Sequence, residues 1–198
     1  MTDKAIEDTK GEIITFAGEV LPAYYHATCA GSTEDANLVW GVDLAPLKGV
    51  ACSFCKDSPH FRWTATVNLK SLEQKLKTAG FKVSDTKSIE IVKRSPSGRV
   101  VTLNITSSSG SIDISGKQLR EIIGPNTLRS TNFKVRIKDK SVLFDGFGWG
   151  HGVGLCQWGA YFMGKKGFTY QEILQHYYPG AKIEEISPQS KDTIVNGQ

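Results

Sequence analysis

Glycine occupies every second position from Gly146 to Gly154 in this 198-residue chain and returns at Gly159. Because glycine carries no side chain, the backbone of such a segment can adopt positive φ and can approach a ligand closely. His151, Gln157 and two tryptophans are interspersed among these glycines. Polar and aromatic groups that converge on glycine-rich backbone favour a functional binding loop. A series of tight turns around a structural histidine is the alternative.

The usual phosphate-binding loops fit this segment poorly. It contains no Gly-Lys-Ser/Thr sequence, and no Gly-x-Gly-x-x-Gly element opens a βαβ unit. The formal net charge of +4 arises from lysines that are scattered along the chain rather than clustered. No basic stripe typical of a nucleic-acid interface is present, so we expect no nucleic-acid partner.

Four sequence motifs resemble those of one protein family. Asp145–Ala160 resembles the closing motif of the SpoIID/LytB family, which comprises stage II sporulation protein D and amidase-enhancer domains, and Tyr170–Gly180 resembles the segment that follows it. Upstream, Tyr25–Glu34 resembles the family's His-Ser-Thr-x-Gly-Gly-x-Thr element, and Leu128–Phe133 is a weaker match. The motifs occur in the family's order, and the resemblance covers residues 4–186.

The resemblance implies action on bacterial cell-wall peptidoglycan, because SpoIID-like domains are lytic transglycosylases that cleave glycan strands to anhydro-muramyl ends. In characterised members the catalytic acid is a glutamate on a helix upstream of the segment that corresponds to Lys10–Thr15. This chain begins just before that segment, and Glu7, Glu12 and Glu34 do not occupy the matching position. The resemblance therefore leaves the catalytic residue unassigned.

The chain is expected to form one SpoIID-like domain over residues 1–186, N-terminally truncated relative to the family, with a polar tail over 187–198. The polar N-terminus has no secretory hydrophobic segment. No apolar run approaches the roughly 18 residues that a membrane helix requires, so we expect no membrane span. The resemblance nevertheless implies an extracytoplasmic location in the cell envelope or periplasm, where the substrate lies.

Two hypotheses about function follow. The chain is either a lytic transglycosylase domain whose acid lies elsewhere, or a non-catalytic glycan-binding or amidase-enhancing module with a cell-wall amidase as partner. Under both, peptidoglycan glycan strands are the ligand, held by polar groups and stacked on tryptophan faces. Tryptophans 40 and 63 occur in segments that read as core. The predicted substrate-binding residues are Ser32, Thr33, Trp149, His151, Gln157 and Trp158.

His26 and three of the four cysteines point to a metal site by their spacing. His26 and Cys29 form an H-x-x-C pair, and Cys52 and Cys55 form a C-x-x-C pair. Two ligand pairs of this kind, brought together by the intervening residues, suit tetrahedral zinc. A redox C-x-x-C, a disulfide or unrelated thiols are the alternatives. Some family members carry zinc on histidine and cysteine ligands, which the resemblance adds.

Four protein ligands would make this zinc structural, because a catalytic zinc keeps one position open for water or substrate. Such a metal would hold the loop that bears Ser32, Thr33 and Glu34. Cys156 lies apart from both pairs, inside the glycine-rich segment. It is expected to be a small packed residue beneath that loop, with a free reactive thiol as the alternative.

The residue pattern predicts a strand-rich α+β fold with several short helices. Hydrophobic content of 39% and charged content of 22% are those of an ordinary globular domain. Alternating apolar residues predict strands, and i, i+4 spacing with capping residues predicts helices. A first strand at 12–17 is expected to pair with 23–26, and a helix over 152–164 to start directly from the glycine-rich segment. The other strands are expected at 61–67, 88–94, 99–106, 112–114, 133–137 and 141–145, with helices at 71–79, 116–123 and from Thr169 to about 178.

Overall fold

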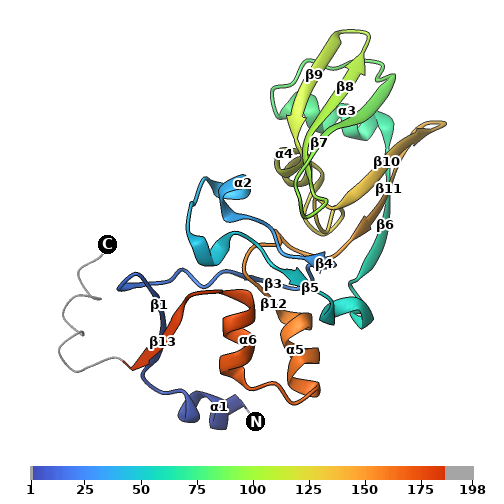
Figure 1. The fold of residues 1–198 in the computed structure, drawn as a ribbon. Coiled ribbons are helices and arrows are strands. Elements are labelled where there is room, and N and C mark those ends of the chain that lie inside the picture. The colour runs from blue at the N-terminus through green and yellow to red at the C-terminus, as the bar shows by residue number, and fades with distance from the viewer. Residues whose placement is uncertain (1, 186–198) are drawn as a thin grey trace.

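The computed structural model describes residues 2–185 and has the predicted α+β fold. The polar tail predicted over 187–198 lies outside the described residues. Figure 1 shows two lobes: the middle of the chain forms the upper lobe, and segments from both ends of the described chain form the lower one. Each lobe is built around its own hydrophobic cluster.

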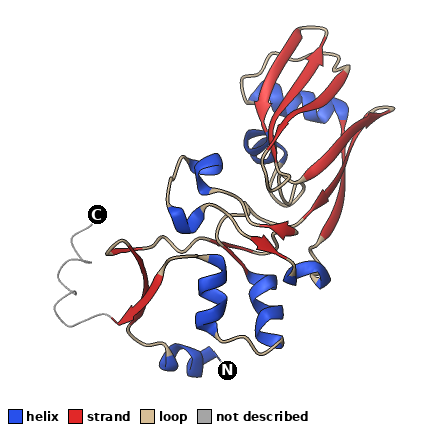
Figure 2. Cartoon of the chain, viewed as in Figure 1, coloured by secondary structure: helices blue, strands red, loops and turns tan. Residues whose placement is uncertain are grey.

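The upper lobe consists of consecutive elements packed around two antiparallel three-stranded sheets, whose strand orders are β7-β8-β9 and β10-β11-β6. Figure 2 shows that strands dominate this lobe. Its elements are β6 (Arg62–Asn68), α3 (Leu69–Thr78), β7 (Ser88–Arg94), β8 (Val100–Ser107), β9 (Gly110–Ser115), α4 (Gly116–Ile123), β10 (Phe133–Lys138) and β11 (Ser141–Phe147).

Hydrophobic alternation and local capping explain these elements. In β8, Leu103 and Ile105 point into the core and are fully buried, and Leu119 of α4 packs in the same cluster. Burial of one such side chain stabilises the fold by about 1.5–3 kcal/mol. Ser115 and Gln118 form a capping box that starts α4. The strands predicted at 88–94 and 99–106, which pair as an antiparallel hairpin, and the helix predicted at 116–123 are thereby confirmed.

The lower lobe is assembled from short elements, with helices α5 and α6 side by side in Figure 1. Its elements are α1 (Thr2–Asp8), β1 (Glu12–Phe16), β2 (Glu19–Val20), β3 (Tyr25–His26), β4 (Gly31–Ser32), α2 (Ala36–Trp40), η1 (Ala45–Leu47), β5 (Ala51–Cys52), η2 (Phe54–Asp57), β12 (Leu155–Cys156), α5 (Gln157–Lys165), α6 (Tyr170–Tyr177) and β13 (Lys182–Glu185).

The predicted pairing of residues 23–26 with the first strand is wrong. Strand β1 pairs instead with β13 and β2, both antiparallel. Strand β3 pairs in parallel with β12, which places His26 beside Cys156. Strand β13 lies 170 residues downstream of β1 and pairs with it at four register positions. The predicted local pairing would have been shorter, because a turn directly joins the two segments.

The helix predicted over 152–164 begins later than expected. Gly152 and Gly154 have φ of 92° and 69°, which a right-handed helix excludes. The chain then forms β12, and α5 starts at Gln157, with the Cys156 sulfur accepting a hydrogen bond from Gly159 N. The helix predicted from Thr169 is confirmed, and Thr169 and Glu172 form a capping box at the start of α6.

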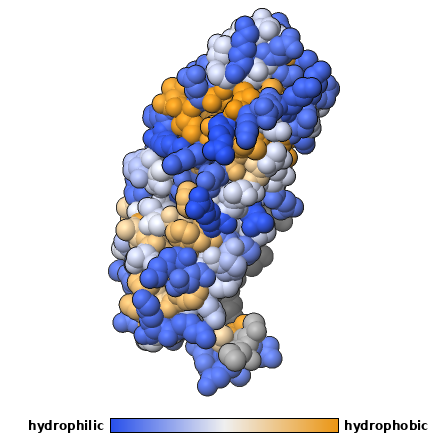
Figure 3. Space-filling model, turned by 90° about the vertical axis from the view of Figure 1, so that its right-hand side faces the viewer, coloured by the Kyte–Doolittle hydropathy of each residue, from blue (hydrophilic) through white to orange (hydrophobic). Residues whose placement is uncertain are grey.

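The surface is hydrophilic over most of the face in Figure 3, and the largest hydrophobic area in that view lies on the upper lobe. Among the helices between residues 2 and 185, none combines the length and the apolar character needed to cross a membrane.

Candidate functional site

The glycine-rich segment packs against the protein's own backbone. A Cβ on Gly154 would lie 2.0 Å from the carbonyl oxygen of Tyr24, and one on Gly148 would lie 2.5 Å from that of Thr28. Trp149 and Thr28 exchange both backbone hydrogen bonds, at 2.8 and 3.0 Å. The glycines therefore allow this segment to run tightly between Tyr25–Glu34 and the upper lobe, and their first role is structural.

This path brings the four cysteines together. Cys29, Cys52, Cys55 and Cys156 are all buried, none forms a disulfide, and their sulfurs lie within 4.8 Å of one another. A tetrahedral site with metal–sulfur bonds of about 2.3 Å has sulfur–sulfur edges of about 3.8 Å. The Cys29 and Cys55 sulfurs are 3.4 Å apart. Four buried cysteines in this arrangement could bind a metal ion.

Hydrogen-bond donors surround the sulfurs in the way that favours thiolates. The Cys156 sulfur accepts from the backbone N–H of Cys29 and of Gly159, both at 3.3 Å. The Tyr177 hydroxyl lies 3.1 Å from the Cys52 sulfur. Hydrogen bonds with Cys156 and then Cys29 lower the pKa of Cys55 to about 7 and also lower that of Cys52. Hydrogen bonds with Cys156 and then Cys52 raise the pKa of Cys29, and the pKa of Cys156 is raised as well, because the lowering effect of its hydrogen bond with Cys29 is outweighed by the hydrogen bonds with Cys52 and Cys55. Thiolates are the form in which cysteine binds metals.

The cysteine cluster corrects the predicted ligand set in one position. Cys29, Cys52 and Cys55 are brought together as predicted, but the fourth member is Cys156 and not His26. The Nδ1 atom of His26 lies 3.1 Å from the carbonyl oxygen of Val153, and because a carbonyl only accepts, this nitrogen carries the proton. Burial, then Arg99 and His151, lowers the pKa of His26 to about 3, so the ring is neutral.

A pocket of about 410 Å³ lies at the junction of the two lobes. That volume is in the range of small-ligand sites. The lower lobe contributes an apolar and aromatic wall that includes Leu38, Val39 and Trp40 of α2, and the upper lobe contributes Lys117, Arg120 and Glu121 of α4. The remaining lining residues are Glu34, Arg99, Val100, Val101, Ser115, Thr131, Gly150 and His151.

Trp40 and His151 form the aromatic part of this pocket. Their ring centroids are 4.8 Å apart, and Tyr24 packs on Trp40 with centroids 4.7 Å apart. Nδ1 of His151 accepts a hydrogen bond from Val153 N at 3.0 Å. Burial foremost lowers the pKa of His151, partly opposed by a backbone hydrogen bond with Tyr25. A neutral imidazole with its Nδ1 occupied serves here to support a ring stack.

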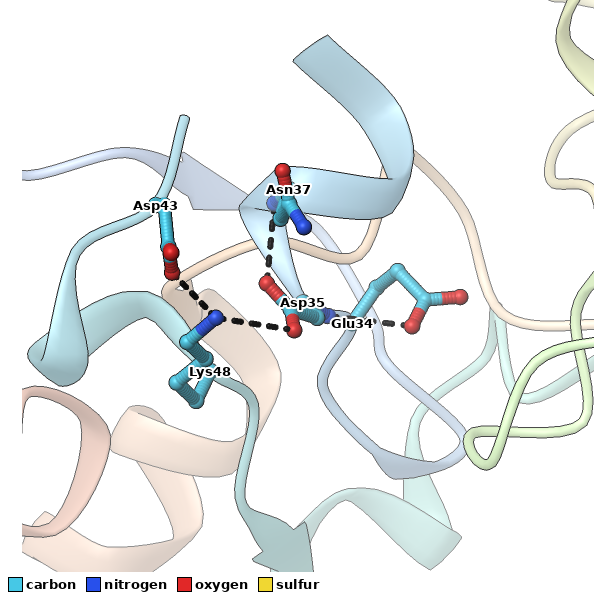
Figure 4. A network of polar contacts seen from close by, with 5 residues as sticks. All are labelled: Glu34, Asp35, Asn37, Asp43 and Lys48. Atoms are coloured by element: carbon cyan, nitrogen blue, oxygen red, sulfur yellow. Dashed lines mark hydrogen bonds and ion pairs between the residues drawn. The ribbon is translucent and has the colours of Figure 1, made fainter. Parts of the chain in front are cut away.

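Glu34 is buried at the boundary between the lobes. One carboxylate oxygen accepts from Asp35 N at 3.0 Å, and the other accepts from the hydroxyls of Ser95 and Ser97 in the β7–β8 turn, at 2.5 and 2.8 Å. In Figure 4 its side chain extends away from the ion pairs that Lys48 makes with Asp35 and Asp43. Glu34 therefore fastens the upper-lobe hairpin to the lower lobe.

The other predicted binding residues lie away from the pocket lining. Ser32 and Thr33 make hydrogen bonds with the backbone of Val50. Trp149 stacks with Arg129, whose guanidinium carbon is 4.8 Å from the ring centroid. Trp158 packs against Tyr161 and Phe162, and Gln157 is exposed at the start of α5. Of the six predicted residues, only His151 lines the pocket.

Two functional residues were misread from the sequence. Trp40 was interpreted as core but is 38% exposed and lines the pocket, whereas Trp63 is buried as expected. Cys156 was assigned to simple packing. No signal in the segment around Cys156 could have shown this, because only the folded chain brings its sulfur within 4.8 Å of the other three.

Comparisons with known proteins identify relatives over most of the chain. A family described as "Domain of unknown function (DUF8618)" matches residues 51–154. An uncharacterized protein of Brachyspira hyodysenteriae is 33% identical over 190 residues, covering 96% of this chain and 50% of the relative. Stage II sporulation protein D of Bacillus subtilis is 31% identical over 182 residues, covering 91% and 50%. The amidase enhancer of the same organism is 27% identical over 230 residues, covering 92% and 32%.

The sporulation and amidase-enhancer names define a class of cell-wall-related sporulation proteins, and more than half of the chain falls within the matched domain. The chain belongs to the SpoIID/LytB family. It spans about half the length of the first relatives that it matches.

Proposed function

We propose that this chain supplies the glycan-binding cleft of a SpoIID-like domain that acts on peptidoglycan in the cell envelope. The observation that carries the proposal is the pocket between the lobes, with an aromatic wall opposite a charged one. Sugar rings have apolar faces that pack on aromatic rings and hydroxyls that bind polar groups. Relatives named for sporulation and for amidase enhancement support a cell-wall ligand.

The two walls suit different parts of such a glycan. Trp40 is 38% exposed and packs against Tyr24 and His151, so a sugar ring could pack on its exposed part without displacing core contacts. Lys117 and Arg120 on α4 place positive charge opposite it. Arg120 donates hydrogen bonds from Nε to the carbonyl oxygen of Leu128 and from one terminal nitrogen to that of Arg129, and these bonds fix the guanidinium in place. A fixed cation favours a glycan that carries carboxylates.

The cysteine cluster is proposed to hold zinc. Four buried thiolates whose sulfurs lie within 4.8 Å of one another are a donor set that zinc prefers and that leaves no position open for water. Zinc bound there would supply structural cross-linking. It would join the Cys29 loop, the Cys52–Cys55 turn and the Cys156 end of the glycine-rich segment.

Cleavage within this chain would need a proton donor in the pocket, and Glu34 is poorly suited to that task. Three donors point at its carboxylate, so it is arranged as a hydrogen-bond acceptor. A general acid must instead be protonated when the leaving oxygen departs. The proposed role of this chain is therefore to bind and orient the glycan, with the acid supplied by a segment outside it.

The proposal is tested by incubating the purified chain with peptide-free glycan strands, followed by mass spectrometry and a pull-down assay. Binding without anhydro-muramyl ends is the expected result. The appearance of such ends would show that the chain carries its own acid, and Glu34→Gln would then test whether Glu34 is that acid. Absence of both binding and cleavage, with stimulation of a cell-wall amidase, would favour the amidase-enhancing alternative.

Trp40→Ala is expected to weaken glycan binding by about tenfold or more, equivalent to the loss of about 1.4 kcal/mol. The ring makes the exposed stacking surface, so its loss removes contact area from the bound sugar while leaving both cores intact. Isothermal titration with peptide-free glycan strands measures the change. Tyr161→Ala is the matched control, because Tyr161 is a 51% exposed aromatic residue outside the pocket lining. Equal affinity of both variants would place the glycan elsewhere.

A further inference from the structure

Arg99 connects the cysteine cluster to the pocket. It directly precedes β8 in the upper lobe, yet its side chain reaches the lower lobe and is only 2% exposed. One terminal nitrogen donates to the carbonyl oxygen of Ser32 and to the Ser97 hydroxyl, and the other donates to the carbonyl oxygen of Cys29, all at 3.0 Å. Gly152 makes room for it, because a Cβ there would lie 2.4 Å from the Arg99 Cζ atom.

The charge of this guanidinium is buried without a contacting carboxylate. Among the ion pairs formed between residues 2 and 185, none within 4.0 Å involves Arg99, and its Nε has no hydrogen-bond partner there. The nearby Glu34 carboxylate accepts from Ser95 and Ser97 and is linked to the guanidinium through the Ser97 hydroxyl rather than by direct contact. A buried, unpaired charge costs several kcal/mol unless negative charge compensates it.

Glu34 and the cysteine cluster are the two sources of negative charge near this guanidinium. Burial lowers the pKa of Arg99, and the charges of Glu34 and then Cys29, Cys156 and Cys55 oppose that shift. Four thiolates around a divalent ion carry a net charge of about −2. Burying such a net charge without a counter-charge is also costly.

We propose that Arg99 is the charge partner and positioning residue of the tetrathiolate metal centre, and that through it the metal centre fixes the β7–β8 hairpin against the lower-lobe side of the pocket. The inference rests on the zinc centre proposed above. Arg99 binds the backbone of the ligand residue Cys29 and, in the same side chain, the Ser97 hydroxyl that holds Glu34. The same buried cation, Arg99, thus contacts both a ligand residue of the metal centre and the hairpin beside the pocket.

The first test compares zinc release from three variants to a colorimetric chelator, after zinc content has been measured by mass spectrometry. Arg99→Gln keeps a hydrogen-bond donor and loses the charge, and Arg99→Lys keeps the charge. Arg94→Gln is the matched control, since Arg94 belongs to the same hairpin and donates to Gly98 and Phe133 without contacting a cysteine. We expect release to accelerate about 10- to 100-fold in Arg99→Gln, as for other residues that support metal ligands. Arg99→Lys should be clearly less affected, and Arg94→Gln unchanged.

Equal release from the two Arg99 variants, or no change in either, would overturn the charge-partner role. A wild-type chain without stoichiometric zinc would instead overturn the proposed zinc centre on which the inference rests.

A second test uses the wild-type chain and so does not depend on the variants folding. Hydrogen exchange is compared before and after zinc removal at the turn Ser95–Gly98 and at β9, which lies farther along the same sheet. The proposal predicts faster exchange in the turn and little change in β9. Unchanged exchange in the turn would overturn the link between metal and hairpin.

Discussion

Cys156→Ser is expected to abolish stoichiometric zinc binding and to lower the melting temperature strongly, whereas His26→Gln is expected to retain one zinc per chain. The Cys156 sulfur lies within 4.8 Å of the other three sulfurs, and serine is a poor zinc ligand. His26 instead donates to the carbonyl oxygen of Val153, a bond that the glutamine amide can replace. A lost structural metal removes stabilisation that is part of the folding free energy itself.

Elemental analysis of the two purified variants, with thermal unfolding in the presence and absence of a chelator, measures this difference. Chelation should destabilise the wild-type chain and His26→Gln but not Cys156→Ser. The ligand set inferred from the spacing of H-x-x-C and C-x-x-C predicts the opposite pattern, with zinc lost in His26→Gln and kept in Cys156→Ser. That result would refute the four-cysteine centre.

Gly154→Ala is expected to destabilise the chain by about 3 kcal/mol or more, in the range of severe core substitutions. An added Cβ would lie 2.0 Å from the Tyr24 carbonyl oxygen, which is backbone and cannot rotate aside, and the φ of 69° is itself strained for alanine. The displaced strand β12 carries Cys156, so zinc affinity should fall in parallel.

Urea unfolding measures the free energy of unfolding of Gly154→Ala and of its matched control, Gly164→Ala. Gly164 lies in α5, and a Cβ there would meet no atom within 4 Å. Alanine should therefore leave stability unchanged or raise it by up to about 1 kcal/mol. Comparable stability of the two variants would mean that the glycine-rich segment does not run against Tyr24.

Local features of the fold were predictable from the sequence. The strands of the β7–β8 hairpin, helix α4 and the capped helix α6 follow from alternation, turn residues and capping boxes within short windows. The family was recognisable for the same reason, because its motifs are contiguous. Pairings between distant segments were not predictable, since β1 could pair with any nearby strand until β13 was placed beside it.

The site was predicted less well because it depends on how the lobes meet. Spacing correctly grouped Cys29, Cys52 and Cys55, but the fourth sulfur comes from a residue about a hundred positions downstream. Trp40 reads as core in its own segment, and only the position of α4 in the other lobe turns its exposed face into a pocket wall. The glycine-rich segment suggested contact with a ligand, whereas its glycines mostly contact backbone.

The location of the glycan site is tested most directly by following the indole N–H signals of the four tryptophans in a nitrogen–proton correlation spectrum while peptide-free glycan strands are added. Single Trp→Phe variants assign the signals. The pocket between the lobes predicts the largest shift for Trp40, with little change for the buried Trp63. The largest shift at Trp149 or Trp158, or no shift at any of the four, would contradict a glycan site in this pocket.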